Sequence, residues 1–434
     1  MSPAAALAHA NPHVRTRPPV GPVSVPLAPH LRPAVRPREP RSPHTHRAPP
    51  FGALDLNAPV APPRAGSRIE ALDFVRGICL LVIAFDHTSS FARKLGYDGR
   101  EWFTPTMLGY SSAAELFLFV SGALIGILHT RPGVTFAQRF VRLSHRAGHL
   151  YLYNALAFVA LLAICSIMLP SSLEALGLAD HVQRPDDSAL SFLLLANSPP
   201  LLDILSLYVA YLLVSIVFVP LAQRAAPLAF GLTLGLYLLC QLPAARAALG
   251  LHGEGYGLNP FAWQLCFMGG LLCGRLGVLD RLERWMQRPA AAVAVLGALA
   301  LATVAFVADR KLGLSDAWWW DKHQLGLLRI PHAALVLAAY FWLSAALRDR
   351  RMPRPALALH EVFASMGRHS LEVFTAGILL TYAAALLVDR LDLGTSGYFL
   401  TLLCLATVLW GFSRYLAWRR RVARPRTAQP APSR

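Results

Sequence analysis

Long apolar stretches, separated by short polar or charged segments, recur along the chain from about residue 70 to residue 418. Ten of them reach the roughly 20 apolar residues that a helix needs to cross the hydrocarbon core of a bilayer. They cover 71–91, 112–130, 150–170, 200–221, 227–246, 260–279, 289–308, 327–347, 370–389 and 397–418. Backbone polar groups in lipid must be satisfied within their own segment. We therefore predict an all-α fold, a polytopic membrane protein with about ten transmembrane helices.

The composition agrees with lipid as the main surroundings. Of the 434 residues, 55% are hydrophobic and only 15% are charged, whereas a soluble domain usually has about 25% charged residues. The six cysteines all lie within apolar stretches and have no metal-ligand spacing, which is typical of small buried side chains. We expect neither a metal site nor a bound cofactor.

The two ends of the chain differ from its middle. Residues 1–68 are rich in Pro, Ala and Arg and have no apolar periodicity, so we predict a disordered cytoplasmic arm. Residues 69–418 form the predicted transmembrane domain, and residues 419–434 a basic cytoplasmic tail. The arm can lie on an anionic lipid surface, or it is an extension without a role.

The formal net charge of +17 comes mostly from arginine. These arginines stand at helix ends and in the two tails, so they indicate a bilayer and no nucleic acid as partner. If the N-terminus is cytoplasmic, most of the 41 Lys and Arg residues fall on the cytoplasmic side. This positive-inside pattern predicts that both termini are cytoplasmic.

Charged side chains inside the first predicted span are the main candidates for chemistry, because ionisable groups in lipid are costly. Asp73 and Arg76 are three residues apart and share a helix face. His87 shares that face about three turns, or roughly 16 Å, farther along the axis. Arg76 near the cytoplasm can hold an anionic coenzyme A thioester, and His87 can act as general base toward an acceptor hydroxyl. Alternatively, Asp73 and Arg76 form a packing ion pair, and His87 caps a helix or bonds to a neighbouring one.

Two carboxylates lie near His87 in this arrangement. Asp86 precedes it and therefore points about 100° away around the helix. Glu115, near the outer end of the second span, lies at a similar depth, from which a carboxylate can orient or stabilise a charged imidazole. We therefore predict that His87, Arg76 and Glu115 form the catalytic group.

Other polar side chains stand at predicted helix ends. On the cytoplasmic side, Arg142 and Arg146 can hold coenzyme A phosphates, and Arg368 with Ser370 precedes a span whose N-terminus suits an anion. On the outer side, the candidates for binding acceptor hydroxyls are Asp86, Asp203, Asn259, Gln264 and His332. The alternative roles are topology-setting charges, helix caps and packing contacts.

Several of these residues stand in motifs that resemble the OpgC family. The motifs are Asp73–Gly77 with Asp86-His87, then Ser112–Gly122, Leu202–Leu205 before Tyr208, Asn259–Gln264 and Gly367–Ser370. They follow the family's order over residues 68 to about 390. The long Pro/Arg-rich arm and the loop from Arg142 to His149 depart from the family pattern.

The resemblance implies a bacterial inner-membrane protein that succinylates osmoregulated periplasmic glucans. The family is similar to the type-three acyltransferase superfamily, whose first helix carries an Arg, ten residues and then a His. Arg76 and His87 have this spacing.

We therefore predict a transmembrane acyltransferase that moves succinyl from succinyl-coenzyme A onto hydroxyls of a periplasmic glucan. Its expected partners are the acyl-coenzyme A co-substrate, the glucan and the bilayer. One alternative is the same class of enzyme with acetyl as the acyl group. Another is a transporter or flippase of a glycan or lipid, although the charged elements show no inverted repeat.

Overall fold

The computed structural model describes residues 70–131, 133–248, 257–313, 317–349 and 351–422. Within these ranges the chain forms helices and connecting segments without a strand, which confirms the all-α prediction. The predicted arm, residues 1–68, lies outside the described residues. Of the predicted tail, only residues 419–422 are described, and they belong to the end of the last helix.

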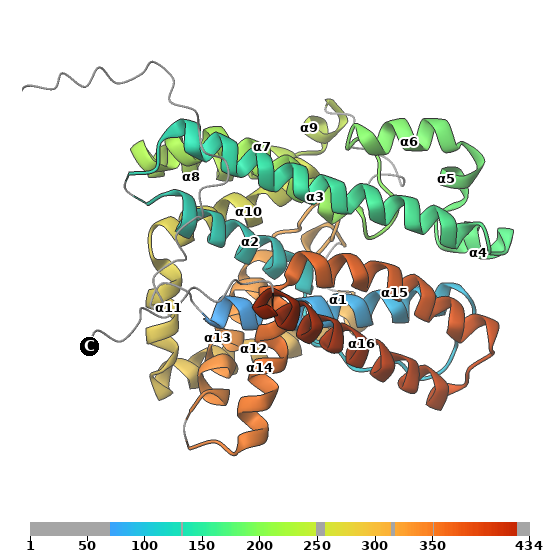
Figure 1. Cartoon of the computed structure of the whole chain (residues 1–434). Coiled ribbons are helices and arrows are strands. Elements are labelled where there is room, and N and C mark those ends of the chain that lie inside the picture. Colours follow the sequence, from blue (N-terminus) through green and yellow to red (C-terminus); the bar gives the residue numbers. More distant parts are fainter. Residues whose placement is uncertain (1–69, 132, 249–256, 314–316, 350, 423–434) are drawn as a thin grey trace, which may run out of the picture. The chain divides into compact units, whose positions relative to one another are not determined.

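Each of the ten predicted spans corresponds to a helix (Figure 1). These helices are α1 (Glu70–Lys94), α2 (Ala113–His129), α3 (Phe136–Cys165), α7 (Asp203–Arg224), α8 (Ala226–Gln241), α10 (Pro260–Arg275), α12 (Pro289–Leu312), α13 (Arg329–Leu347), α15 (Ser370–Arg390) and α16 (Thr395–Val422). The shorter elements are η1 (Pro105–Leu108), α4 (Pro170–Ala175), α5 (Ala179–Gln183), α6 (Pro185–Leu193), α9 (Pro243–Ala248), α11 (Val278–Met286), η2 (Ala317–Trp319) and α14 (Arg354–Arg368).

Within the described ranges, six helices are long and apolar enough to cross a membrane: α3, α7, α12, α13, α15 and α16. The pair α10 and α11, bent by 81°, adds a seventh if it is counted as one span. Helices α2 and α8 are apolar but shorter, and α1 carries several charged residues. The chain is thus a multi-pass membrane protein, while the count of ten spans and the cytoplasmic termini stay predictions.

Helix α3 extends about four turns beyond the predicted span at its N-terminal end. Helix α3 begins at Phe136 and not near residue 150, because Thr135 caps it. The Thr135 hydroxyl accepts a hydrogen bond from the Gln138 backbone N–H at 3.2 Å, and the Gln138 side chain accepts one from the Thr135 N–H. Arg142 and Arg146 therefore lie within a helix, one turn apart along its axis.

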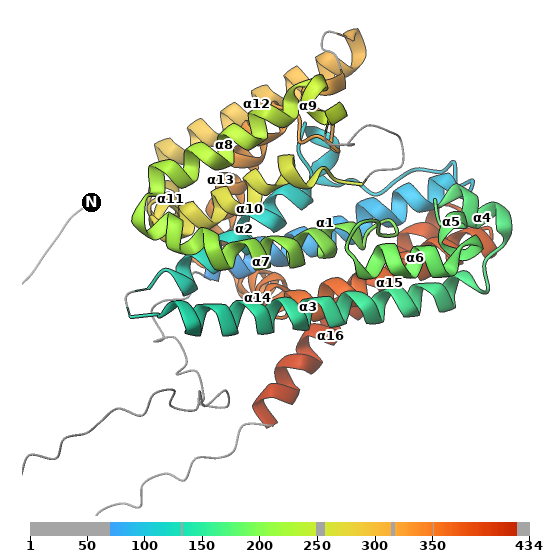
Figure 2. The ribbon, with the colours of Figure 1, turned by 90° about the horizontal axis from the view of Figure 1, so that it is seen from above.

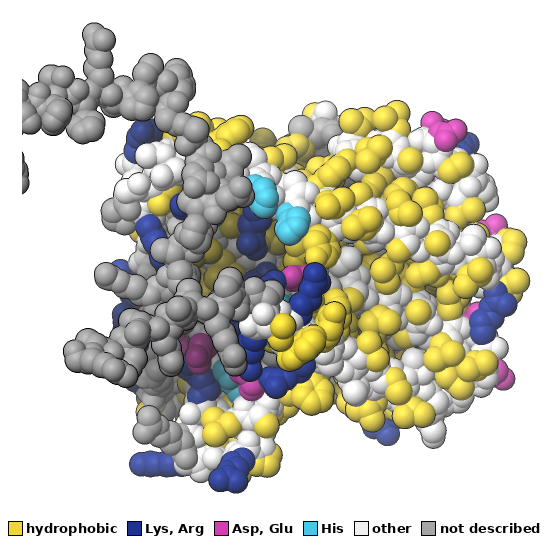
Figure 3. Space-filling view, in the orientation of Figure 1, with side chains coloured by type: hydrophobic (Ala, Val, Ile, Leu, Met, Phe, Trp, Pro, Cys, Tyr) yellow, Lys and Arg dark blue, Asp and Glu magenta, His cyan; other side chains and the backbone are white. Residues whose placement is uncertain are grey.

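Helix α1 is enclosed by other helices. It packs against α2, α13, α14 and α15, so Asp73 and Arg76 are buried within the bundle. Helix α12, in contrast, lies at the edge of the described bundle, where it contacts α13 (Figure 2). The space-filling view shows hydrophobic side chains over a broad area and Lys and Arg gathered toward one end (Figure 3).

Glycines allow α1 and α14 to approach closely. A Cβ atom on Gly77 of α1 would collide with the carbonyl oxygen of Phe363, and one on Gly367 of α14 would collide with the carbonyl oxygen of Asp73. The two glycines therefore permit a reciprocal contact between helix backbones, as small residues commonly do in membrane proteins.

The same arrangement joins α2 to α10. Gly122 and Gly126 on α2 each face a carbonyl oxygen of α10, and Gly270 and Gly274 on α10 each face a carbonyl oxygen of α2. Both pairs have the spacing of four residues that brings small residues onto one helix face. Two such crossings therefore fix the positions of α1 and α2 in the bundle.

Substituting a glycine at a crossing should destabilise the protein. We expect Gly367→Ala to lower the free energy of unfolding by about 1–3 kcal/mol, because the added methyl group must displace backbone. The measurement is thermal unfolding of the detergent-solubilised protein. Gly148→Ala in α3 is the matched control, since a Cβ there meets no atom within 4 Å. Equal melting temperatures for the two variants would contradict the crossing.

Candidate active site

A cavity of about 400 Å³ opens at the end of the bundle where arginines gather. The arginines that line it are Arg76, Arg131, Arg146, Arg368 and Arg420. We call it the basic cavity. Figure 3 shows the hollow between α2 and α16, with dark blue side chains in it. Guanidinium groups that converge on a cavity of this size suit phosphate groups.

The arginines of the basic cavity come from separate elements and have different partners. Arg146 of α3 donates to the Tyr208 hydroxyl at 3.1 Å, and Arg420 of α16 donates to Glu372 at 2.7 Å. Arg368 pairs with Glu361. Arg76, which is 6% exposed, lies with its guanidinium 5.8 Å from the centre of the Phe117 ring. Ser370, at the start of α15, lines the same cavity.

Arg142 lies apart from this group. Its side chain is exposed and does not line the basic cavity. Within α3, Arg146 follows Arg142 by one helical turn and reaches the cavity instead. Of the four predicted donor-binding residues, the structure therefore brings Arg146, Arg368 and Ser370 together and leaves Arg142 outside.

His87 lines two adjoining cavities at the other end of α1. The first outer cavity, about 350 Å³, also includes Asp86, Tyr110 and Arg329, and the second, about 330 Å³, includes Lys94 and Asp203. Five residues line both: Ile83, His87, Ser90, Ala114 and Lys322. His87 thus stands between two spaces large enough for polar ligands.

The imidazole of His87 has few protein partners. It contacts the Phe91 ring at a centroid distance of 6.2 Å, and it makes no hydrogen bond to any residue that the structure describes. Its nitrogens are therefore available to a ligand in either outer cavity. A histidine with this exposure to a cavity can accept a proton from a bound hydroxyl.

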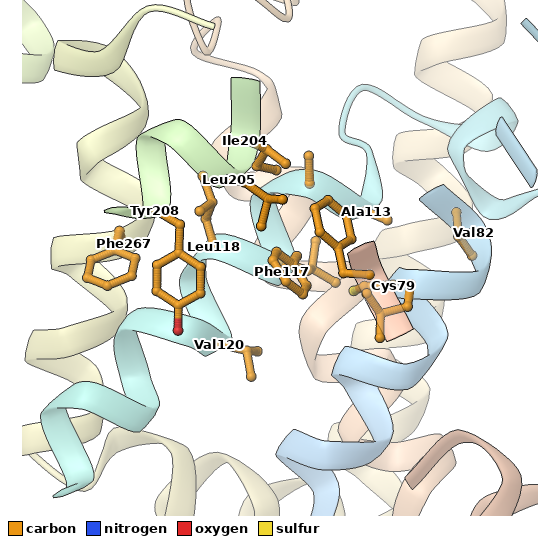
Figure 4. Close-up of a cluster of buried hydrophobic side chains, with 14 of the residues drawn as sticks. Cys79, Val82, Ala113, Phe117, Leu118, Val120, Ile204, Leu205, Tyr208 and Phe267 are labelled. Atoms are coloured by element: carbon orange, nitrogen blue, oxygen red, sulfur yellow. The ribbon is translucent and has the colours of Figure 1, made fainter. Parts of the chain in front are cut away.

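Two stacked aromatic rings separate the two ends. Phe374 of α15 lines both the basic cavity and the second outer cavity. Its ring stacks on that of Phe117 from α2, with centroids 5.1 Å apart. Figure 4 shows Phe117 among Cys79 of α1 and Leu205 of α7. The pair is buried and lies between the basic cavity and the second outer cavity.

Glu115, which was predicted to support the His87 imidazole, bonds to Arg329 and Ser112 instead. One of its carboxylate oxygens accepts from the Arg329 Nε at 2.6 Å, and the other accepts from the Ser112 hydroxyl and backbone N–H at 2.7 and 3.0 Å. Both oxygens are thus occupied by an ion pair and a capping box. The structure places Glu115 as the anchor of Arg329 and gives it no contact with His87.

Two predicted acceptor-binding residues do share cavities with His87. Asp86 lines the first outer cavity, where its carboxylate accepts from the Thr104 and Thr106 hydroxyls at 2.5 and 2.7 Å. Asp203 lines the second. Asp86 therefore also holds the segment before α2 against α1.

Three other predicted acceptor-binding residues have structural contacts and do not line the outer cavities. Asn259 caps α10 by accepting from the backbone of Phe261 and Ala262. Gln264 donates to the Thr233 carbonyl at 2.7 Å. The Nδ1 of His332 accepts from the Ser111 N–H at 3.2 Å. The structure thus shows these three side chains in contacts within the fold, and their binding of the acceptor stays a prediction.

The sequence analysis missed residues whose importance depends on the tertiary fold. Arg329, the first residue of α13, lines the first outer cavity, and Lys322, in the segment before α13, lines both. Tyr110 also lines the first outer cavity; burial, and next the Asp309 carboxylate, raise the pKa of its hydroxyl, so it stays neutral. The sequence signal that could have identified Arg329 and Lys322 is a basic residue at the outer end of a predicted span.

The buried pair of Glu115 and Arg329 should contribute strongly to stability. We expect Glu115→Gln to lower the free energy of unfolding by about 3–5 kcal/mol, because it leaves Arg329 buried without its counter-charge. The double variant Glu115→Gln with Arg329→Gln should recover part of this loss. Thermal unfolding measures both. Glu101→Gln, which breaks a more exposed pair with Arg93, is the control and should cost less than about 1 kcal/mol.

Comparisons with known proteins agree with the predicted resemblance. The comparison with curated proteins gave no match, and neither did the comparison with solved structures. A family described as OpgC protein matches residues 68–421, which includes every described helix from α1 to α15 and nearly all of α16. The chain therefore belongs to the OpgC family.

Proposed function

We propose that this protein transfers succinyl from cytoplasmic succinyl-coenzyme A to hydroxyls of periplasmic glucans. Membership of the OpgC family implies an acyltransferase for periplasmic glucans. One observation carries the finer proposal: a single helix, α1, presents Arg76 to a basic cavity and His87 to two outer cavities, with the Phe117–Phe374 pair between them.

The basic cavity suits the donor. Coenzyme A carries several phosphate charges, and five arginines face the cavity. Arg76 is the one that lies on α1 and beside Phe117. The phosphates would occupy the arginines at the mouth, and the thioester arm would extend past Arg76 toward the aromatic pair.

The outer cavities suit the acceptor. A glucan hydroxyl in either space can reach the His87 imidazole, while Asp86 and Asp203 offer carboxylates to neighbouring hydroxyls. Glu115 supports the site indirectly, since it fixes Arg329 in the wall of the first outer cavity.

The proposed chemistry is a general-base acyl transfer. His87 takes the proton of the glucan hydroxyl, and the oxygen attacks the thioester carbonyl. The tetrahedral intermediate then collapses, the carbon–sulfur bond breaks, and the coenzyme A thiolate receives the proton from His87. The products are a glucan ester and free coenzyme A. The thioester must pass the aromatic pair to meet His87, so the rings must move during each cycle.

Removing an arginine of the basic cavity should weaken donor binding. We expect Arg76→Ala and Arg146→Ala each to raise the KM for succinyl-coenzyme A by about tenfold or more, because each variant removes a cationic contact with the anionic donor. Release of free coenzyme A thiol by the solubilised protein measures this. Arg142→Ala is the matched control on the same helix as Arg146 and should leave KM unchanged. A rise for Arg142→Ala equal to that for Arg146→Ala would argue against the basic cavity as the donor site.

Removing the proposed base should abolish acylation in cells. We expect His87→Ala to reduce glucan succinylation by about 10²–10⁴-fold. The measurement is mass spectrometry of periplasmic glucans from a deletion strain complemented with wild type, His87→Ala or the control His145→Ala, whose imidazole is exposed on α3. Blots confirm equal amounts in the membrane.

Each result of that experiment has a definite meaning. Succinylation by wild type and His145→Ala but not by His87→Ala supports the base. Full restoration by His87→Ala would show that His87 is structural. Acetyl esters from the wild type would change the acyl group, and unaltered glucans would favour transport over transfer.

A further inference from the structure

Lys322 shares with His87 the wall between the two outer cavities. It is half-buried and lines both spaces. It lies in the connection between α12 and α13. Two cavities that share a histidine and a lysine place a base and a cation beside the same bound molecule.

The position of Lys322 is fixed by its neighbours. Its backbone carbonyl accepts from the Trp263 indole at 2.9 Å. The carbonyl of His323 accepts from the Asn259 backbone N–H at 2.9 Å, and Asn259 also donates to the Gln324 side chain at 2.7 Å. This segment is thus bound to the start of α10, so Lys322 is held in place before any ligand arrives.

Of the three cations that line the first outer cavity, Arg310, Lys322 and Arg329, Lys322 is the one whose ammonium group has no charged or aromatic partner within the described part of the chain. Arg329 is paired with Glu115, and Arg310 lies 5.1 Å from the centre of the Trp320 ring. Within the described part of the chain, Lys322 has no ion pair. The nearby Asp86 carboxylate is already bound by two threonine hydroxyls.

We propose that Lys322 binds the free carboxylate of a dicarboxylic acyl group and so selects succinyl over neutral acyl groups. The inference rests on the proposed function. With the thioester carbonyl at His87, the distal carboxylate of succinyl extends by two methylene groups into the outer cavities that Lys322 lines. A neutral acyl group of the same length leaves the ammonium without that partner.

A donor competition tests the selection. Purified full-length protein in proteoliposomes receives equal amounts of succinyl-coenzyme A and butyryl-coenzyme A with a glucan acceptor, and mass spectrometry counts the two esters. Butyryl has the same chain length as succinyl and no charge. We expect the wild type to prefer succinyl by about tenfold or more, since the charged contact is lost with butyryl.

The variants separate charge from structure. Lys322→Met should lose the preference while still transferring butyryl, and Lys322→Arg should keep it. Lys311→Met removes an exposed lysine of α12 that lines neither outer cavity, and should change nothing. If Lys322→Met does not fold, Lys322→Gln should show the same loss of preference.

Other results would overturn the inference. Retained preference in a folded Lys322→Met or Lys322→Gln would remove Lys322 from donor selection and leave the proposed function intact. An equal fall in both esters would assign Lys322 to the acceptor. A wild type that transfers neither acyl group would overturn the proposed function and this inference together.

Discussion

The close approach of α1 and α14 at Gly77 and Gly367 is the constraint on which the site depends. Each glycine faces a carbonyl oxygen of the other helix, and each stands next to an arginine of the basic cavity, Arg76 or Arg368. The crossing therefore brings two distant segments to one cavity without any direct contact between the arginines. The second glycine crossing, between α2 and α10, fixes the position of α2 in the bundle. Phe117 and Glu115 belong to α2, so the crossing also fixes where these two side chains lie beside α1.

The helices could be predicted from the sequence because the signal for each is local. An apolar run of about 20 residues indicates a helix in lipid whatever its neighbours are. The extension of α3 back to Phe136 was not predicted, because the capping box at Thr135 precedes the apolar run and lies in a charged segment. The spacing of Arg76 and His87 on one helix was equally local, and the structure opens both to cavities.

The partners of the site residues could not be predicted, because they come from distant parts of the chain. Glu115 meets Arg329 across 214 residues, and no periodicity connects them. Asn259 and Gln264 were predicted to bind the acceptor beside His87, yet the fold uses both for its own hydrogen bonds. A polar side chain at a helix end thus identifies a candidate, and only the tertiary fold decides between a cap and a ligand contact.

The aromatic wall has an electrical consequence. Cavities filled with water on both sides would conduct ions far better than packed helices, so most of the membrane voltage would fall across the layer formed by Phe117 and Phe374. Moving one elementary charge through about 100 mV is worth about 2.3 kcal/mol. In a cell whose interior is negative, the electrical energy of an anionic acyl group falls when the group crosses this layer outward. The bilayer potential would then assist the crossing step of a succinyl group and leave that of an acetyl group unaided.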